Sequence, residues 1–202
     1  MLRHLILVAA LSVGPLLPLS AVAQPLVQDV PQSAQNVSSP TLRGISGITP
    51  LGGNLYMVVD DIDGGVGTPQ FHVMTLNVNL TSGFLVSSLL TSSTGFASGS
   101  QYESIEFNSN TGYLYVCSEF DHTIRKVDGD GLQLGFVPTP SIYGSAQGNR
   151  SLESLAYQDE IDVLWTANEE ELTVDSGTNH VRLQRFVGEV ATEQYAYPVE
   201  LP

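Results

Sequence analysis

Cysteine and basic residues are scarce in this sequence, and each shortage excludes a class of protein. Cys117 is the single cysteine, so no disulfide can form within the chain, and a zinc site built from several cysteines is excluded. Seven Lys and Arg residues stand against 21 Asp and Glu residues, which gives a formal net charge of −14. Because a chain this acidic is repelled by phosphate groups, we expect it to bind neither nucleic acid nor anionic lipid.

Several common catalytic signatures are also missing. The serine-containing segments 44–47 and 97–100 do not have the GxSxG spacing of a nucleophile elbow. The HExxH pattern of zinc proteases, the glycine-rich phosphate loop and the dinucleotide fingerprint do not occur either. The sequence therefore gives no support for a serine-hydrolase mechanism or for any of these other sites.

Residues 1–23 are predicted to form an export signal. Arg3 and His4 give a short polar start, an almost wholly apolar run follows, and an Ala-Val-Ala cleavage pattern precedes Gln24. Two prolines interrupt the run, which favours a cleaved signal over the alternative of an N-terminal membrane anchor. We therefore expect a periplasmic or secreted protein without a membrane span after cleavage, whose lone cysteine is buried rather than bridged.

The folded part of the chain is predicted to begin near Leu42, after an N-terminal arm over residues 24–41. A hydrophobic content of 42% with 14% charged residues indicates a packed core. Beyond Leu42, nearly every apolar stretch is short and is bounded by Gly, Asn, Asp or Ser, and no helical periodicity is found. This pattern predicts an all-β domain over residues 42–202, made of many short antiparallel strands.

An internal repeat is the most informative feature of the sequence. Three segments each contain a first strand, a turn and a second strand with a Leu-aromatic pair: residues 44–60, 102–119 and 152–169. Each second strand ends on an acid, and these acids are Asp60, Glu119 and Glu169. The second and third copies are offset by about 50 residues, so that Glu103 matches Glu153.

Two further strands are expected after each of these hairpins: residues 71–78 and 83–90, 122–127 and 132–137, and 180–187 and 194–199. Four strands per repeat predict a β-propeller blade, whereas a β-sandwich would not repeat residue identities at a fixed interval. Propellers close with roughly four to eight blades, and this chain supplies about three. We therefore expect part of a six- or seven-bladed propeller, completed by further blades of a longer gene product or by self-association.

Motifs spread from Leu42 to Val199 resemble those of a known family. The motifs are YESIEF, YVCSEFDHTIRKVDGDG, NRSLESLAY, LWTANEEEL and QYAYPVE. Together they resemble the exported proteins described as having a phytase-like domain with esterase-like activity. The resemblance implies a β-propeller and a hydrolase acting on ester or phosphoester bonds. Ser104 and Ser154 depart from the family, which commonly has glycine at these positions, although both residues are small.

Acidic residues at equivalent positions of the blades are expected to gather at one end of the sheets. In a hairpin, the start of the first strand and the end of the second lie at the same edge. With Ile105 placed opposite Tyr115, Glu103 would lie near Glu119, and the third repeat would place its two glutamates likewise. The inner strands of neighbouring blades converge on a central channel, so these carboxylates would share one mouth of it.

Carboxylates gathered at one mouth repel one another, and a bound Ca²⁺ or another divalent cation would relieve the repulsion. Such a cation polarises a phosphoryl or acyl oxygen and activates water. We assign metal ligation to Asp60, Glu119 and Glu169, and catalysis to Glu103, Glu153 and Arg150. The alternative is that the acids are solvated strand ends or caps for backbone amides, and that Arg150 pairs with Glu153.

Other candidate residues carry weaker signals. Asp128–Gly131 resembles part of a calcium loop, but it lies between two expected strands and is predicted to be a hairpin turn. The acidic loop 60–65 lies beside the expected carboxylate mouth, which keeps a metal-binding role open for it. His122 is expected at the surface, and His72 and His180 carry less signal still.

Three functions are left open by the sequence. The first is metal-assisted hydrolysis of a small-molecule ester or phosphoester. The second is that of a non-catalytic exported propeller, stabilised by calcium, that binds a partner through its channel face. In the third, the chain is an inactive fragment of a longer protein.

Overall fold

The computed structural model describes residues 42–61, 67–99, 101–148 and 150–199. The predicted export signal and N-terminal arm lie outside these residues, as does most of the acidic loop after Asp61. In the described part, no helix is long and apolar enough to cross a membrane. All the strands given below come from one compact unit.

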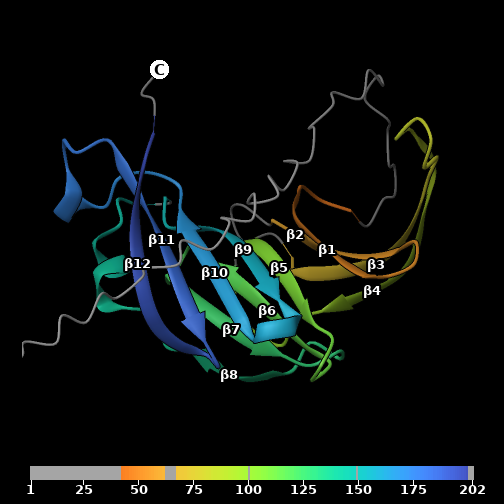
Figure 1. Cartoon of the computed structure of the whole chain (residues 1–202). Coiled ribbons are helices and arrows are strands. Elements are labelled where there is room, and N and C mark those ends of the chain that lie inside the picture. The colour runs from red at the N-terminus through yellow and green to blue at the C-terminus, as the bar shows by residue number, and fades with distance from the viewer. Residues whose placement is uncertain (1–41, 62–66, 100, 149, 200–202) are drawn as a thin grey trace, which may run out of the picture. The chain divides into compact units, whose positions relative to one another are not determined.

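The described strands form three four-stranded antiparallel sheets (Figure 1). The first sheet contains β1 (Ile45–Gly52), β2 (Leu55–Asp60), β3 (Gln70–Val78) and β4 (Leu85–Gly95). The second contains β5 (Tyr102–Asn108), β6 (Tyr113–Ser118), β7 (Thr123–Val127) and β8 (Gln133–Val137). The third contains β9 (Leu152–Gln158), β10 (Val163–Asn168), β11 (His180–Val187) and β12 (Val190–Pro198). Each sheet is a meander of consecutive strands, which confirms the predicted all-β class with about three four-stranded propeller blades.

Short 3₁₀ helices lie in the connections of the second and third blades: η2 (Ser141–Ser145), η3 (Asp159–Ile161) and η4 (Thr173–Asp175). β12 begins earlier than predicted. Gly188 and Glu189 both have positive φ, 53° and 64°, which is the geometry of a tight two-residue hairpin turn. Val190 therefore pairs with Val187 at once, and the strand starts there rather than at Gln194.

The segment Asp128–Gly131 forms the predicted hairpin turn between β7 and β8. The carboxylate Oδ1 of Asp128 accepts the backbone N–H groups of Asp130 and Leu132, at 3.0 and 2.9 Å. The aspartate thus satisfies the amides of its own turn, a common role for this residue type.

Alternate side chains of β6 are buried on opposite faces of the second blade. Leu114 and Val116 belong to an apolar cluster shared with the first blade, whereas Tyr115 and Cys117 belong to one shared with the third blade. Because side chains alternate along a strand, a continuous apolar run suits a sheet that is packed on both faces. Cys117 is a free, fully buried cysteine, as the sequence predicted.

The first strand of the second blade, β5, lies against the first strands of the other two, β1 and β9. The hydroxyl of Ser46 donates to the carbonyl of Tyr102 at 2.6 Å, and the N–H of Leu155 donates to Oγ of Ser104 at 3.0 Å. A Cβ atom on Gly47 would lie only 2.7 Å from the Cα of Ser104. Small residues are therefore needed where neighbouring blades approach, and the serine that departs from the family pattern adds a hydrogen bond there.

Replacement of Gly47 by alanine is expected to lower the free energy of unfolding by about 1–3 kcal/mol, because the added methyl group must displace backbone atoms of β5. Gly135→Ala in β8 is a matched control, since a Cβ there meets no atom within 4 Å. Urea unfolding measures both variants. Equal stability of the two would contradict the close approach of β1 and β5.

The register of the β5–β6 hairpin differs from the prediction. Ile105 lies opposite Val116, not opposite Tyr115. The turn that follows Asn108 places this residue opposite Tyr113, and turn geometry fixes the pairing of the rest of the hairpin. The predicted pairing was therefore wrong by one residue.

Candidate functional site

A β-bulge lies near the start of the first strand of each blade. The pairing of β5 with β6 skips Glu103, the pairing of β9 with β10 skips Glu153, and in the first blade the pairing of β1 with β2 skips Ser46. A bulge leaves its extra residue outside the ladder and re-aims the side chain, and bulges are frequent beside active sites. The two glutamates predicted to be catalytic thus share one special backbone position.

Glu119 and Glu169 share a second position, immediately after the second strand of their blades. The backbone N–H of Glu119 donates to the carbonyl of Gln101 at 3.0 Å, and that of Glu169 donates to the carbonyl of Ser151 at 2.9 Å. In the first blade, Asp61 makes the equivalent bond, which is 2.7 Å long. These three acids are therefore structural counterparts.

Asp60 does not occupy the position that the repeat predicted. It lies within the β1–β2 ladder, where its counterparts in the other blades are Ser118 and Asn168. Its Oδ1 lies 3.0 Å from Nε2 of His72, and both side chains are buried. Two consecutive acids, Asp60 and Asp61, stand at the end of β2. The repeat was aligned on the first of them, although Asp61 is the counterpart of the strand-end glutamates.

Three glutamates from two blades converge at this end of the sheets. The carboxylates of Glu119, Glu153 and Glu169 each offer one oxygen, and these oxygens all lie within 4.8 Å of one another. Glu119 is buried, with 3% of its surface exposed, Glu153 is half-buried and Glu169 is exposed. The bulge of β9 and the ends of β6 and β10 supply them, so the group bridges the second and third blades. We call it the three-glutamate group.

Crowding changes the protonation of two members of this group. Burial, a hydrogen bond with Glu119 and the charges of neighbouring glutamates together raise the pKa of Glu153 to about 8. Burial also raises the pKa of Glu119, and the hydrogen bond from Glu153 partly offsets that rise. Glu119 and Glu153 therefore hold a shared proton more tightly than two separate glutamates would.

Further acids surround the three-glutamate group. The charge of Glu103 contributes to the raised pKa of Glu153, and the charge of Asp61 contributes to the raised pKa of Glu119. Glu103 is half-buried. The predicted gathering of acids therefore includes Glu103 and Asp61 beside the group itself, while Asp60 lies apart with His72.

The residues present suit a hard divalent cation. Ca²⁺ and Mg²⁺ prefer carboxylate oxygens, and three such groups lie close enough here to share one ion. Burial and the charges of neighbouring carboxylates together raise the pKa values of Glu119 and Glu153, and a bound cation would relieve this crowding. Glu119, Glu153 and Glu169 are thus the residues that would hold a metal.

Arg150 forms an ion pair with Glu170, and both side chains are about half exposed. As the alternative to catalysis, the sequence predicted an ion pair of Arg150 with Glu153, and that partner was wrong. Glu153 instead lies with other carboxylates, because the bulge directs it to the three-glutamate group.

Two residues of this region were missed or underrated. Asp61 was treated only as part of an acidic loop, although counting one residue further along the repeat would have identified it. His72 is fully buried against Asp60, and no spacing or motif in the sequence signals this contact. His122 is half-buried and His180 lines a separate cavity.

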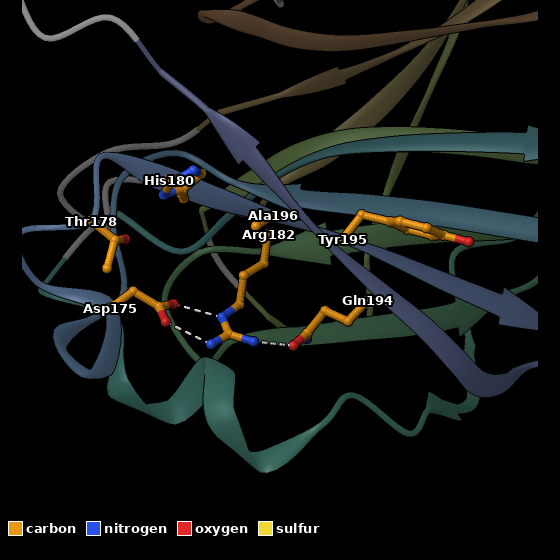
Figure 2. Close-up of a pocket in the computed structure, with 7 residues that line it drawn as sticks. All are labelled: Asp175, Thr178, His180, Arg182, Gln194, Tyr195 and Ala196. Carbon is orange, nitrogen blue, oxygen red and sulfur yellow. Dashed lines mark hydrogen bonds and ion pairs between the residues drawn. The ribbon is translucent and has the colours of Figure 1, made fainter.

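That cavity of about 340 Å³ lies on the third blade (Figure 2). Arg182 projects into the region shown and is neutralised there, with its Nε and Nη2 each 2.6 Å from an oxygen of Asp175 and its Nη1 bonded to Gln194. None of the predicted site residues lines the cavity. It therefore gives no support to the carboxylate site.

These features define an all-β protein of propeller blades with a carboxylate centre between two of them. The family described as "Phytase-like: Esterase-like activity of phytase" matches residues 40–202, and the chain belongs to this family. A search of curated proteins finds no match.

Several solved structures are similar to part of the chain. One from a nidogen/laminin complex is 10% identical and has a TM-score of 0.47, with 75% of this chain and 47% of that chain covered. A Bacteroides uniformis protein described as a candidate 6-phosphogluconolactonase is 13% identical, with a TM-score of 0.43 and coverages of 81% and 46%. For the hydrazine synthase of Kuenenia stuttgartiensis these values are 9%, 0.43, 83% and 53%. The chain spans about half the length of each of them.

Proposed function

We propose that this chain is a metal-assisted hydrolase of phosphoester or ester bonds, with Ca²⁺ or another divalent cation held by Glu119, Glu153 and Glu169. The observation that carries the proposal is the convergence of these carboxylates, from two blades, to within 4.8 Å of one another. Membership of the phytase-like family supports hydrolase chemistry at the level of class. The substrate is expected to be a small molecule.

A divalent cation in this site supplies polarisation of a phosphoryl or acyl oxygen and a more acidic bound water. The chain contributes carboxylates that are already held together. The proton of Glu153 must leave when a cation binds, because metal ligands bind in their deprotonated form. Glu103, which repeats the bulge position of Glu153, is assigned as the general base that takes a proton from water.

Arg150 remains the proposed contact for a substrate phosphate. Its present partner is the half-exposed Glu170, and ion pairs of this kind are worth little in water. A phosphate oxygen can therefore replace Glu170 at the guanidinium group without a large loss.

Hydrolysis of p-nitrophenyl phosphate and p-nitrophenyl acetate tests the proposal. The chelated protein is expected to be nearly inactive toward p-nitrophenyl phosphate, and one of Ca²⁺, Mg²⁺, Mn²⁺ or Zn²⁺, added singly, should raise turnover by at least about tenfold. A rise with only one of the two esters identifies the bond type. Turnover of p-nitrophenyl phosphate that chelation leaves unchanged would exclude a metal-assisted mechanism.

A calcium-stabilised binding module is the second candidate, and the position of the three-glutamate group favours it over an inactive fragment. An ion held there would join the ends of the second and third blades and stabilise their packing. A rise in Tm with Ca²⁺, without metal-dependent turnover of either ester, would support this candidate over the hydrolase.

Export is part of the proposal as well. The apolar N-terminal run and its Ala-Val-Ala pattern support cleavage before Gln24, and a periplasmic or secreted location. Mass spectrometry of the N-terminal peptide of the protein expressed from its full gene should find Gln24 first, as glutamine or as the pyroglutamate that it forms on cyclisation. An intact N-terminus would contradict cleavage.

A further inference from the structure

A serine, a histidine and an aspartate lie in line within the first blade, apart from the three-glutamate group. Nδ1 of His72 is 2.7 Å from Oγ of Ser93, and its Nε2 is 3.0 Å from Oδ1 of Asp60. His72 and Ser93 are directly opposite one another in the β3–β4 ladder. The imidazole and the carboxylate are buried, with 0% and 1% exposed, whereas the serine is exposed to solvent.

The surroundings of His72 determine its tautomer. The carboxylate of Asp60 lies 3.0 Å from Nε2 of His72 without the geometry of a hydrogen bond, and its charge favours the tautomer with the proton on Nε2. Nδ1 is then a lone-pair acceptor facing the hydroxyl of Ser93. The backbone N–H of Arg43 also donates to Oδ1 of Asp60, at 3.3 Å, and helps to fix this carboxylate.

The same position has a polar residue in every described blade. His72 lies in the third strand of its blade, paired with a residue of the second strand. The residues in the same register of the other two blades are Arg125 and Gln184, and both are buried. Arg125 donates to Gln133 at 2.7 Å, and Gln184 accepts from Gln194 at 3.0 Å. A polar link from the third strand to the fourth is thus a structural feature of the repeat. Among the described blades, the first alone places a hydroxyl against an imidazole at this link.

We propose that Ser93 is a nucleophile toward small, activated esters, with His72 as its general base and Asp60 as the positioning residue. The exposed serine is accessible to an ester from solvent, while the buried pair behind it accepts and stabilises a proton. This activity needs no metal, and it is distinct from the proposed function of the three-glutamate group.

The reaction balances with water alone. The hydroxyl proton of Ser93 passes to Nδ1 of His72 as Oγ forms a bond to the acyl carbon. The bond to the leaving alkoxide then breaks, and the alkoxide takes the proton from His72. Water hydrolyses the acyl-serine by the same transfers, which releases the carboxylic acid and restores the hydroxyl.

Labelling with a biotin fluorophosphonate tests the proposal, because this probe loses fluoride and forms a stable bond to an activated serine. Peptide mass spectrometry of the full chain, with chelator present, is expected to find the adduct on Ser93. Ser93→Ala should abolish labelling. Ser92→Ala is the matched control, since Ser92 is exposed on the same strand but lies opposite Val73, and labelling should be unchanged.

Loss of the base separates an activated serine from an ordinary exposed one. His72→Gln, checked for folding by near-UV circular dichroism, is expected to slow labelling by about 100-fold. If that variant does not fold, Asp60→Asn supplies the second arm, with slower labelling expected. The absence of an adduct on Ser93, equal adducts on Ser92 and Ser93, or an undiminished rate in a folded His72 or Asp60 variant would overturn the proposal.

Discussion

Replacement of Glu153 by glutamine is expected to lower metal-dependent phosphoester hydrolysis by about 100-fold or more. The substitution keeps the size of the side chain but removes one of the carboxylates that lie within 4.8 Å of one another. It also removes the group whose proton must leave before a cation can bind. Initial rates with p-nitrophenyl phosphate over a range of Ca²⁺ concentrations measure the effect.

Glu160→Gln is the matched control for this variant. Glu160 belongs to the same blade, is exposed, and lies in η3, between the two strands of the hairpin whose other end carries Glu153. The control replaces the same type of side chain by the same amide and is expected to keep the wild-type rate. Equal rates for the two variants would remove Glu153 from the proposed centre.

In the presence of chelator, the free energy of unfolding is expected to fall between about pH 5 and about pH 8. Glu153 has a pKa of about 8 in the folded chain and 4.5 as an ordinary glutamate, so folding favours its protonated form. Its stabilising contribution is complete below the lower value and is lost as the pH rises through the higher one. Because Glu153 is only half-buried, solvent screens its charge. We therefore expect a loss of about 1–2 kcal/mol, well below the free energy that corresponds to the full difference in pKa.

Urea unfolding of the chelated wild type and of Glu153→Gln across this pH range measures the effect. Glu106 also titrates in the window, since burial raises its pKa to about 7, and its contribution remains in both proteins. The difference between the two curves therefore reports Glu153 together with its coupled neighbour Glu119, and the variant should be the more stable at about pH 8. Curves of equal slope would show that Glu153 ionises like an exposed glutamate.

Most of the blade architecture was predictable from local patterns. The hairpin pairs recur in sequence because each blade needs the same alternation of buried side chains, as in β6. The recurrence of Glu103 as Glu153, and of Glu119 as Glu169, was sufficient to identify the acidic end of the sheets. Identity at a fixed interval implies the same position in each blade, whatever the exact pairing of the strands.

The detailed geometry of the site was not predictable, because small backbone features determine it. A bulge at Glu103 or Glu153 adds one residue to a strand without changing its apolar pattern, so the sequence contains no sign of it. Asp60 was chosen in place of Asp61 because two consecutive acids end β2, and the residue types alone do not show which of them matches the strand-end glutamates. The contact of His72 with Ser93 depends on the pairing of β3 with β4, which residue types alone do not determine.

Anomalous diffraction from crystals of the chain soaked in Tb³⁺, a surrogate for Ca²⁺, is the most direct test of the carboxylate centre. We predict one strong peak, bound by oxygens of Glu119, Glu153 and Glu169 at about 2.3–2.6 Å, the usual distance range for calcium ligands. The peak should disappear in Glu153→Gln and remain in Glu160→Gln. A peak elsewhere with none between these three carboxylates would contradict the proposed metal centre.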